Sequence, residues 1–244
     1  YFVICESLSR MVIGLNNLSQ TLPGSQWSES LSPYKLPDMD QDNLKAFLQN
    51  GMYQITTGAV TPNLDLNENV NVGSKWTLYC INAPIEEILS RYASTVNYNV
   101  NWPEEQEQIK QIAITLFMPS TSERKIPEYS AGSAGLIARL GDNQINIYNP
   151  NDYMGLDTHK ATMTAEAIMS WRRFLLRFRG DHRTANAHYM LGVMQDLSGQ
   201  QAAALSEYKL VSNKFFHDPL APFALFNASK IKTDIKDYDG AMQD

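Results

Sequence analysis

The fold of this chain is decided by residues 165–191, AEAIMSWRRFLLRFRGDHRTANAHYML, which recur 37 positions later as residues 202–228, AAALSEYKLVSNKFFHDPLAPFALFNA. Size and polarity are kept at matched positions: Trp171 falls on Tyr208, and most of the matched apolar residues sit at helical spacing. A fixed period of roughly 20–50 residues is the sequence signature of a stacked-repeat architecture. The pattern therefore predicts that residues 162–244 form an array of similar units.

Each unit is predicted to be a pair of helices. One apolar stripe runs through Ala187, Leu191 and Met194, and Gly199 follows where the helix would end. A second stripe follows at helical spacing, and it consists of Ala204, Leu205, Tyr208, Val211 and Phe215. The next helix is expected to begin after His217-Asp-Pro219, because proline suits the first turn of a helix.

This pattern resembles a tetratricopeptide repeat. The resemblance rests on Ala187-His-Tyr-Met-Leu-Gly192, on Ala204 and Tyr208, and on Asp218-Pro-Leu-Ala-Pro-Phe-Ala224. It is most similar to the slightly long variety of the repeat that is found in bacterial envelope proteins, and it covers residues 162–244. An ordinary helical bundle is the alternative fold for this region.

The resemblance also implies a binding surface, because the first helix of each pair in this family lines a groove that holds peptides. Two positions depart from the family pattern: Gln195 stands where an aromatic residue is usual, and His182 stands where the next unit has Pro219. The same first-helix residues could equally pack one repeat against the next. The expected protein-binding groove consists of Asn186, Tyr189, Val193, Asp196, Phe223, Phe226 and Lys230.

A second informative stretch, residues 75–150, predicts a small α+β domain. Strands are expected at Trp76–Ile81, Val96–Trp102 and Gln111–Phe117, and a hairpin at 136–148. After the first strand, a helix is predicted from the apolar stripe Ile85, Ile88, Leu89, Tyr92 and Ala93, which follows Pro84. That order implies a helix on one face of a sheet.

The phrases Asn-Ala-Pro-Ile-Glu-Glu-Ile-Leu at 82–89, Asn-Tyr-Asn-Val at 97–100 and Asn-Gln-Ile-Asn-Ile-Tyr at 143–148 are similar to the short N-terminal domain of secretins and TonB-dependent receptors. In that family the domain is a protein-interaction module without catalytic residues. The resemblance implies a second helix at 119–135, a stretch rich in Ser, Pro and Gly that is a poor helix candidate. An unrelated ferredoxin-like α+β domain is the alternative.

Residues 1–74 are predicted to be an N-terminal helical segment and linker. An amphipathic pattern over 1–18 suits a short helix, the tail of something upstream, and 21–39 is a loop rich in Ser and Pro. A short helix is expected at 40–49 and a strand at 52–60, followed by a loop from 61 to 74. The fold class is therefore α+β: a small α/β sandwich-like domain followed by an all-α, tetratricopeptide-like solenoid.

The length, the net charge and the composition of the chain limit the classes of function that it can have. A length of 244 residues is enough for two domains, and the net charge of −6 argues against a nucleic-acid binder. No apolar run reaches the length of about 18 residues that spans a membrane. Because the chain begins at Tyr1 and ends inside an expected helix, it is interpreted as a piece of a longer protein. The last repeat is then expected to expose an apolar helix face, which would self-associate or bind another protein. Cys5 and Cys80 fit no metal or redox spacing, so two buried thiols are favoured over a pair.

No catalytic, cofactor or metal site is predicted. The four histidines do not have metal-ligand spacing, and Ser130–Gly135 lacks the Lys that a phosphate loop requires. One charge feature contrasts with the acidic whole, a basic patch that could receive an acidic peptide, an anionic polymer or lipid headgroups. A solvated helix face is its simpler interpretation. The basic patch consists of Arg172, Arg173, Arg177, Arg179 and Arg183, with His182 beside them.

The sequence thus predicts a non-enzymatic scaffold or assembly subunit of a complex in the bacterial cell envelope or periplasm. Its partners would be other proteins, with self-association as a further expectation. Two alternatives stay open: an accessory or ring-forming component of a secretion or transport channel, and a non-catalytic part of a larger enzyme.

Overall fold

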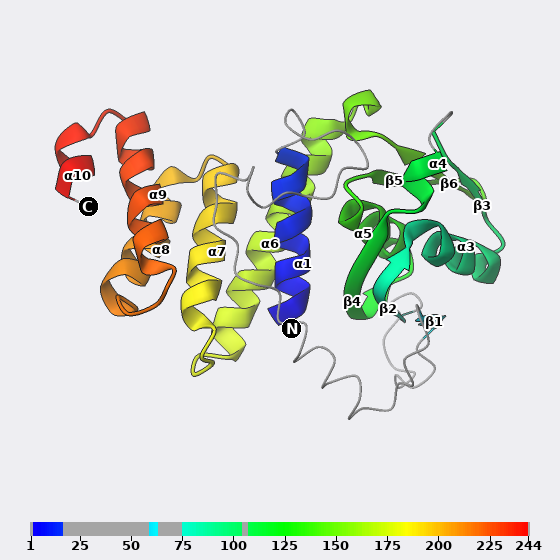
Figure 1. Ribbon diagram of the computed structural model, residues 1–244, viewed down its shortest axis with the longest axis horizontal. Coiled ribbons are helices and arrows are strands. Elements are labelled where there is room, and N and C mark those ends of the chain that lie inside the picture. The colour runs from blue at the N-terminus through cyan, green and yellow to red at the C-terminus, as the bar shows by residue number, and fades with distance from the viewer. Residues whose placement is uncertain (1, 17–58, 63–74, 104–106, 244) are drawn as a thin grey trace. The chain divides into compact units, whose positions relative to one another are not determined.

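The computed structural model describes residues 2–16, 59–62, 75–103 and 107–243 (Figure 1). They divide into two compact units. A helical unit joins the N-terminal helix to residues 157–244, and an α+β unit holds the described residues between 59 and 156. The helix expected at 40–49, the loop at 21–39 and most of the strand expected at 52–60 lie outside the described residues.

The α+β unit contains two three-stranded sheets. In the first, β2 is central and pairs antiparallel with both β1 and β4. In the second, β6 is central, pairs antiparallel with β5 and parallel with β3. The strands are β1 (Ala59–Pro62), β2 (Lys75–Pro84), β3 (Asn99–Asn101), β4 (Ala113–Ser122), β5 (Ile137–Gly141) and β6 (Gln144–Tyr148).

Helix α3 (Ile85–Val96) begins after Pro84, as the sequence predicts, and it includes Val96, where a strand was expected to begin. Pro84 precedes it with φ −56°, and Glu86 and Glu87 lie in its first turn, where carboxylates favour the positive helix end. Asn97 ends it in the left-handed conformation, with φ 57°. The predicted apolar stripe is confirmed as the buried face, which consists of Ile85, Ile88, Leu89, Tyr92 and Ala93.

A second helix, α5 (Lys125–Ser133), lies in the stretch that looked poor for a helix. Pro127 is tolerated because it stands in the first turn, where the backbone N–H has no partner in the helix. Ser130 is buried and donates its hydroxyl hydrogen to the carbonyl of Ile126 at 2.8 Å. Small residues thus satisfy their polar groups locally and allow close packing. One helical turn, α4 (Glu107–Lys110), lies in the polar stretch before β4.

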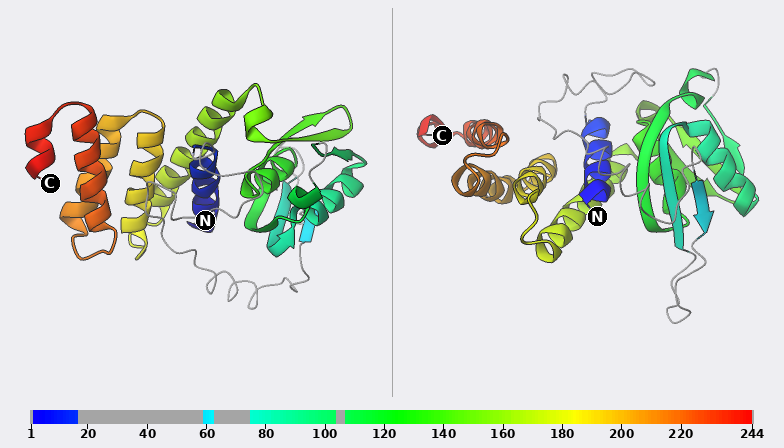
Figure 2. Two further views of the ribbon diagram at one scale, coloured as in Figure 1. Left: turned by 45° about the horizontal axis from the view of Figure 1, so that its top comes forward. Right: turned by 60° about the horizontal axis from the view of Figure 1, so that its bottom comes forward.

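The helical unit shows the predicted period. Helix α9 begins 37 residues after α7, and α10 begins 37 residues after α8. The right-hand view of Figure 2 looks nearly along α7, α8 and α9, which stack in sequence order. The helices are α6 (Leu156–Arg177), α7 (Thr184–Leu197), α8 (Gln201–Lys214), α9 (Ala221–Asp234) and α10 (Tyr238–Gln243). Among the described residues, no helix is both long and apolar enough to cross a membrane.

Close packing of α7 on α8 depends on Gly192. A Cβ atom at this position would come within 2.8 Å of the Tyr208 ring, so only glycine permits the approach. Tyr208 and Tyr189 are both fully buried, with ring centroids 5.9 Å apart. Asn227 on α9 donates a hydrogen bond to the Tyr189 hydroxyl at 3.3 Å. One repeat is therefore joined to the next through a polar contact inside an apolar interface.

Helix α1 (Phe2–Asn16) belongs to the helical unit and packs against its helices, which the sequence did not indicate. The Phe2 ring lies 5.3 Å from that of Trp171 and 5.4 Å from that of Phe174. Ser9 accepts a hydrogen bond from the Trp171 indole at 2.7 Å. Apolar residues occur all round α1 rather than on one side only. The α+β unit is thus inserted in the chain between two helices that pack together, α1 and α6.

Candidate functional site

The predicted groove residues fall into two groups. On α7, Tyr189 and Val193 are fully buried, and Asn186 and Asp196 are half-buried. On α9, Phe223 is 41% exposed, Phe226 is 64% exposed and Lys230 is also exposed. The structure therefore does not bring all seven residues to one open surface.

Tyr189 and Val193 are packing residues, and their assignment to an open groove is wrong. Tyr189 contacts Tyr208 and accepts the hydrogen bond from Asn227, so both its ring and its hydroxyl are used inside the stack. The cause is the position of α7, which packs against α1 on one side and α8 on another. The repeat-to-repeat role, which the sequence left open, is the one that these two side chains have.

The second group forms one continuous surface on α9. Phe223, Phe226 and Lys230 are three and four residues apart, a spacing that places them on one side of a helix. We call these three residues the α9 face. Two exposed phenylalanines beside a cation are a suitable contact for an apolar, partly acidic segment of another protein.

Four members of the basic patch are exposed, and one is not. Arg172, Arg173, Arg177 and Arg179 face solvent. Arg183 instead holds both oxygens of Asp181, at 2.9 and 2.8 Å, and its guanidinium stacks over the Phe2 ring at 4.6 Å. Arg183 therefore fixes the turn between α6 and α7 against α1, and it does not belong to the basic surface.

The hydrogen bonds from Arg183 also lower the pKa of the Asp181 carboxyl group. They are the main reason why the pKa of this carboxyl falls from its usual 3.8 to about 2, and the backbone N–H of Arg183 adds a further hydrogen bond at 2.9 Å. His182, with 79% of its side chain exposed, contributes a smaller share. This cluster stabilises a turn and shows no feature of a reactive site.

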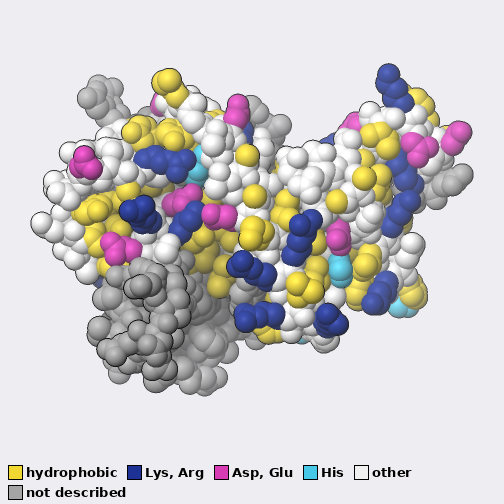
Figure 3. Space-filling view, turned by 180° about the vertical axis from the view of Figure 1, so that it is seen from behind, with side chains coloured by type: hydrophobic (Ala, Val, Ile, Leu, Met, Phe, Trp, Pro, Cys, Tyr) yellow, Lys and Arg dark blue, Asp and Glu magenta, His cyan; other side chains and the backbone are white. Residues whose placement is uncertain are grey.

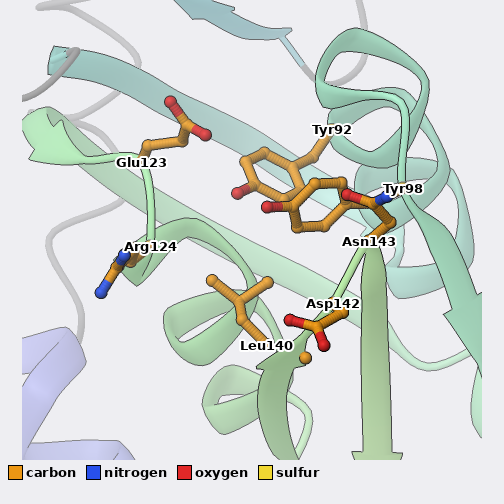
Figure 4. A pocket seen from close by; sticks show the side chains of 8 residues that line it. Tyr92, Tyr98, Glu123, Arg124, Leu140, Asp142 and Asn143 are labelled. Atoms are coloured by element: carbon orange, nitrogen blue, oxygen red, sulfur yellow. The ribbon is translucent and has the colours of Figure 1, made fainter.

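Sequence reasoning did not identify a pocket in the α+β unit (Figure 4). It has a volume of about 640 Å³ and is lined by Tyr92, Tyr98, Glu123, Arg124 and residues 140–143. In Figure 4 the hydroxyls of the two tyrosines point to the side on which Glu123 lies, whereas Arg124 points away from them. No sequence signal could have found this pocket, because its lining comes from four separate segments.

Tyr92 is the buried member of this pocket. Burial raises the pKa of its hydroxyl well above its usual range, and the nearby charge of Glu123 acts in the same direction. A tyrosine in this environment stays protonated and can act only as a hydrogen-bond partner, so it is not a base or a nucleophile at neutral pH. The pocket offers polar contacts for a ligand, and its geometry does not define a reaction.

Cys5 and Cys80 are free and buried, which confirms the interpretation favoured from the sequence. Burial raises the pKa of each thiol from 9.0 to about 12. Such thiols are poor nucleophiles because the reactive thiolate is scarce. No cluster of three or more His, Cys, Asp or Glu side chains suited to a metal occurs in the described part of the chain.

His188 on α7 and Glu207 on α8 form a polar pair between these two helices. The His188 Nδ1 atom lies 2.7 Å from a carboxylate oxygen of Glu207, and the ring of Phe215 stacks on the imidazole at 6.2 Å. Both side chains are mostly buried in the helix interface. The pair links the two helices of one hairpin.

The chain was compared with protein-family models, with curated proteins and with solved structures, and none of them matches it significantly.

Proposed function

We propose that this protein is a non-enzymatic interaction scaffold, or assembly subunit, of a complex in the bacterial cell envelope, and that it holds a partner protein on the α9 face. The observation that carries this proposal is the stack of helix hairpins at a 37-residue period, in which Phe223 and Phe226 remain exposed. Stacked helix pairs present such surfaces to peptides. The periplasmic or envelope location rests on the resemblance of the repeat to those of bacterial envelope proteins.

Most of the large apolar side chains of the helix pairs are buried between helices, and only those left exposed can contact a partner. Tyr189 and Tyr208 are buried between the stacked helices. Phe226 occupies the position of Tyr189 one period later, and it is 64% exposed. The same position is thus buried in one repeat and exposed in the next. An exposed phenylalanine leaves apolar surface in contact with water, and a partner that buries this surface would gain binding free energy.

A second candidate is an accessory or ring-forming subunit of a secretion or transport channel. It is favoured by the order of elements in the α+β unit, β2–α3–β3 followed by β4–α5–β5–β6. The sequence resemblance to the short N-terminal domain of secretins implies a strand–helix–strand unit followed by a second one, and α5 supplies the second helix. In this reading the α+β unit would contact further copies of itself or a transporter.

The scaffold proposal is tested by placing a photo-crosslinking amino acid at Phe226 in the intact protein and irradiating its native envelope fraction. We expect one or a few defined partners, whose yield falls at least ~tenfold in the double variant Phe223→Ser/Phe226→Ser, measured by pull-down. Met154, which is fully exposed in the α+β unit, gives the matched control Met154→Ser, with no expected loss. Equal recovery of the partners with both variants would exclude the α9 face.

The channel candidate is distinguished from the scaffold proposal by measuring the mass of the purified assembly. Light scattering should give a closed ring of many copies if it holds, and a small stoichiometric complex with other proteins if the scaffold proposal holds.

A further inference from the structure

The exposed side of α6 carries apolar side chains between arginines. Met169 is 51% exposed and Leu176 is 66% exposed, and a separation of seven residues places them almost in line along the helix. At about 100° per residue, Arg172 stands to one side of this line, and Arg173 and Arg177 stand to the other. We call these five residues the α6 ridge.

The repeat itself provides an internal comparison for this ridge. One period later, Met169 corresponds to Ser206 and Leu176 corresponds to Asn213, and both of these residues of α8 are exposed. The packing of a helix in this position therefore does not require an apolar side chain at either site. The packing of the helical unit therefore does not explain why Met169 and Leu176 are apolar, and an interaction outside this unit would explain it.

The positive charge follows the opposite trend, because it is kept from α6 to α8. Arg172 corresponds to Lys209, and Arg177 corresponds to Lys214. In the part of the chain that the structure describes, no ion pair involves Arg172, Arg173 or Arg177. A protein with a net charge of −6 thus presents free cations along one helix. Figure 3 shows Lys and Arg side chains, with apolar side chains between them, over the helical unit on the face it displays.

A further exposed apolar residue, Phe178, stands just beyond the C-terminal end of α6. Phe178 is 40% exposed and leans on Phe174, whose ring centroid is 5.2 Å from its own, and Arg179 is exposed beside it. Phe178 is therefore held in place from below while its outer edge faces solvent. At about 100° per residue, however, Phe178 lies on the opposite side of α6 from Met169, so it is not part of the ridge.

We propose that the α6 ridge docks this protein peripherally on a membrane surface rich in anionic phospholipid. Met169 and Leu176 would enter the boundary between headgroups and acyl chains, and the arginines on both sides would bind phosphate oxygens, for which the guanidinium fork is well shaped. Apolar residues in the centre with cations at the flanks match a flat boundary that is apolar below and anionic above. This binding lies on a different helix from the α9 face and is independent of the partner proposed there.

The test is co-sedimentation of the full chain with vesicles of phosphatidylcholine alone or with about 30 mol % phosphatidylglycerol. We expect binding only to the anionic vesicles, weakened at high salt, because each arginine near such a surface contributes about fivefold. The variant Met169→Ser/Leu176→Asn, which copies the residues of α8, should bind at least ~tenfold more weakly. The variant Arg172→Gln/Arg177→Gln should lose most of the salt-dependent binding.

The control is Phe223→Ser/Phe226→Ser, which removes exposed apolar side chains from α9 and should leave vesicle binding unchanged. Circular dichroism of every variant separates loss of binding from loss of fold, and the polar residues of α8 show that the first variant suits a helix here. No binding to anionic vesicles at about 0.1 M salt would overturn the proposal. Binding to polyglutamate that needs the arginines but not Met169 and Leu176 would replace it with an acidic protein partner.

Discussion

Trp171 donates a hydrogen bond from its indole nitrogen to the hydroxyl oxygen of Ser9, over 2.7 Å, although the two residues are 162 positions apart in the chain. Both side chains are fully buried. Ser9 thus satisfies a donor that would otherwise be buried alone, and the contact fixes α1 to α6. The stability of the helical unit depends on a residue that the repeat pattern does not include.

The variant Ser9→Ala should lower the free energy of unfolding by roughly 1–3 kcal/mol, because it leaves the Trp171 N–H buried without an acceptor. Urea unfolding followed by circular dichroism measures this change. Ser206→Ala is the matched control: its hydroxyl bonds only to the carbonyl of Ala202 on an exposed helix face, and its effect should stay within about 0.5 kcal/mol. Equal effects of the two changes would show that the contact with Trp171 does not stabilise the protein.

The variant Gly192→Ala should destabilise the protein, although the same change in an exposed helix stabilises by about 1 kcal/mol. The added methyl would lie 2.8 Å from the Tyr208 ring, and overpacking of this kind costs roughly 1–3 kcal/mol. Gly180, which has no atom within 4 Å of its Cβ position, gives the control Gly180→Ala. A more stable Gly192→Ala protein in thermal unfolding would contradict the close contact.

The turn between α6 and α7 should weaken in acid. Because the pKa of Asp181 is lowered from 3.8 to about 2 in the folded state, its contribution is fully present above pH 3.8 and is lost as the pH falls toward 2. Thermal unfolding of Asp181→Asn should therefore occur below that of the parent at pH 6, and the two curves should converge near pH 2. A constant difference across this range would argue against the pairing with Arg183.

Both cysteines should be silent to a thiol reagent in the native protein. Burial raises each pKa to about 12, so at pH 8 almost no thiolate exists, and the side chains are also inaccessible. Titration with a disulfide reagent should give no fast phase in buffer and two thiols in urea. Since the folded-state pKa is above the unfolded 9.0, the stability that these thiols contribute is present below pH 9 and declines as the pH rises toward 12.

Gln195 provides a stabilising substitution. It is 2% exposed, and its Oε1 atom has no hydrogen-bond partner among the described residues. The variant Gln195→Met keeps the length of the side chain, removes the buried carbonyl and should raise the free energy of unfolding by roughly 1 kcal/mol. Gln200→Met, at an exposed position, should have no effect. A destabilised Gln195→Met protein would indicate that the amide makes a contact essential to the stack.

The sequence predicted the parts of the fold that depend on local patterns. The 37-residue period and the stripe of α3 are periodic, so the positions of α7 to α10 and the buried face of α3 followed directly. The helix α5 was recognised only as a poor candidate, because its small residues carry little periodic apolar signal. Its packing, and not its propensity, makes it a helix.

The location of α1 and the exposure of the groove residues could not be predicted. The docking of α1 joins segments that are far apart, and no local pattern contains this information. Tyr189 and Phe226 occupy the same position of the repeat, yet one is fully buried and the other is 64% exposed. Burial at such a position is decided by the neighbouring helices and not by the residue type.

The insertion of the α+β unit between α1 and α6 has a consequence for synthesis. At about 5–20 residues per second, Trp171 leaves the ribosome roughly 8–30 seconds after Ser9. During that interval α1 carries Phe2, Leu8 and Met11 with nothing of its final partner helix yet made. We expect this segment to be shielded during synthesis by temporary contacts or by a chaperone, so that the yield of folded protein depends on the order of translation as well as on the final structure.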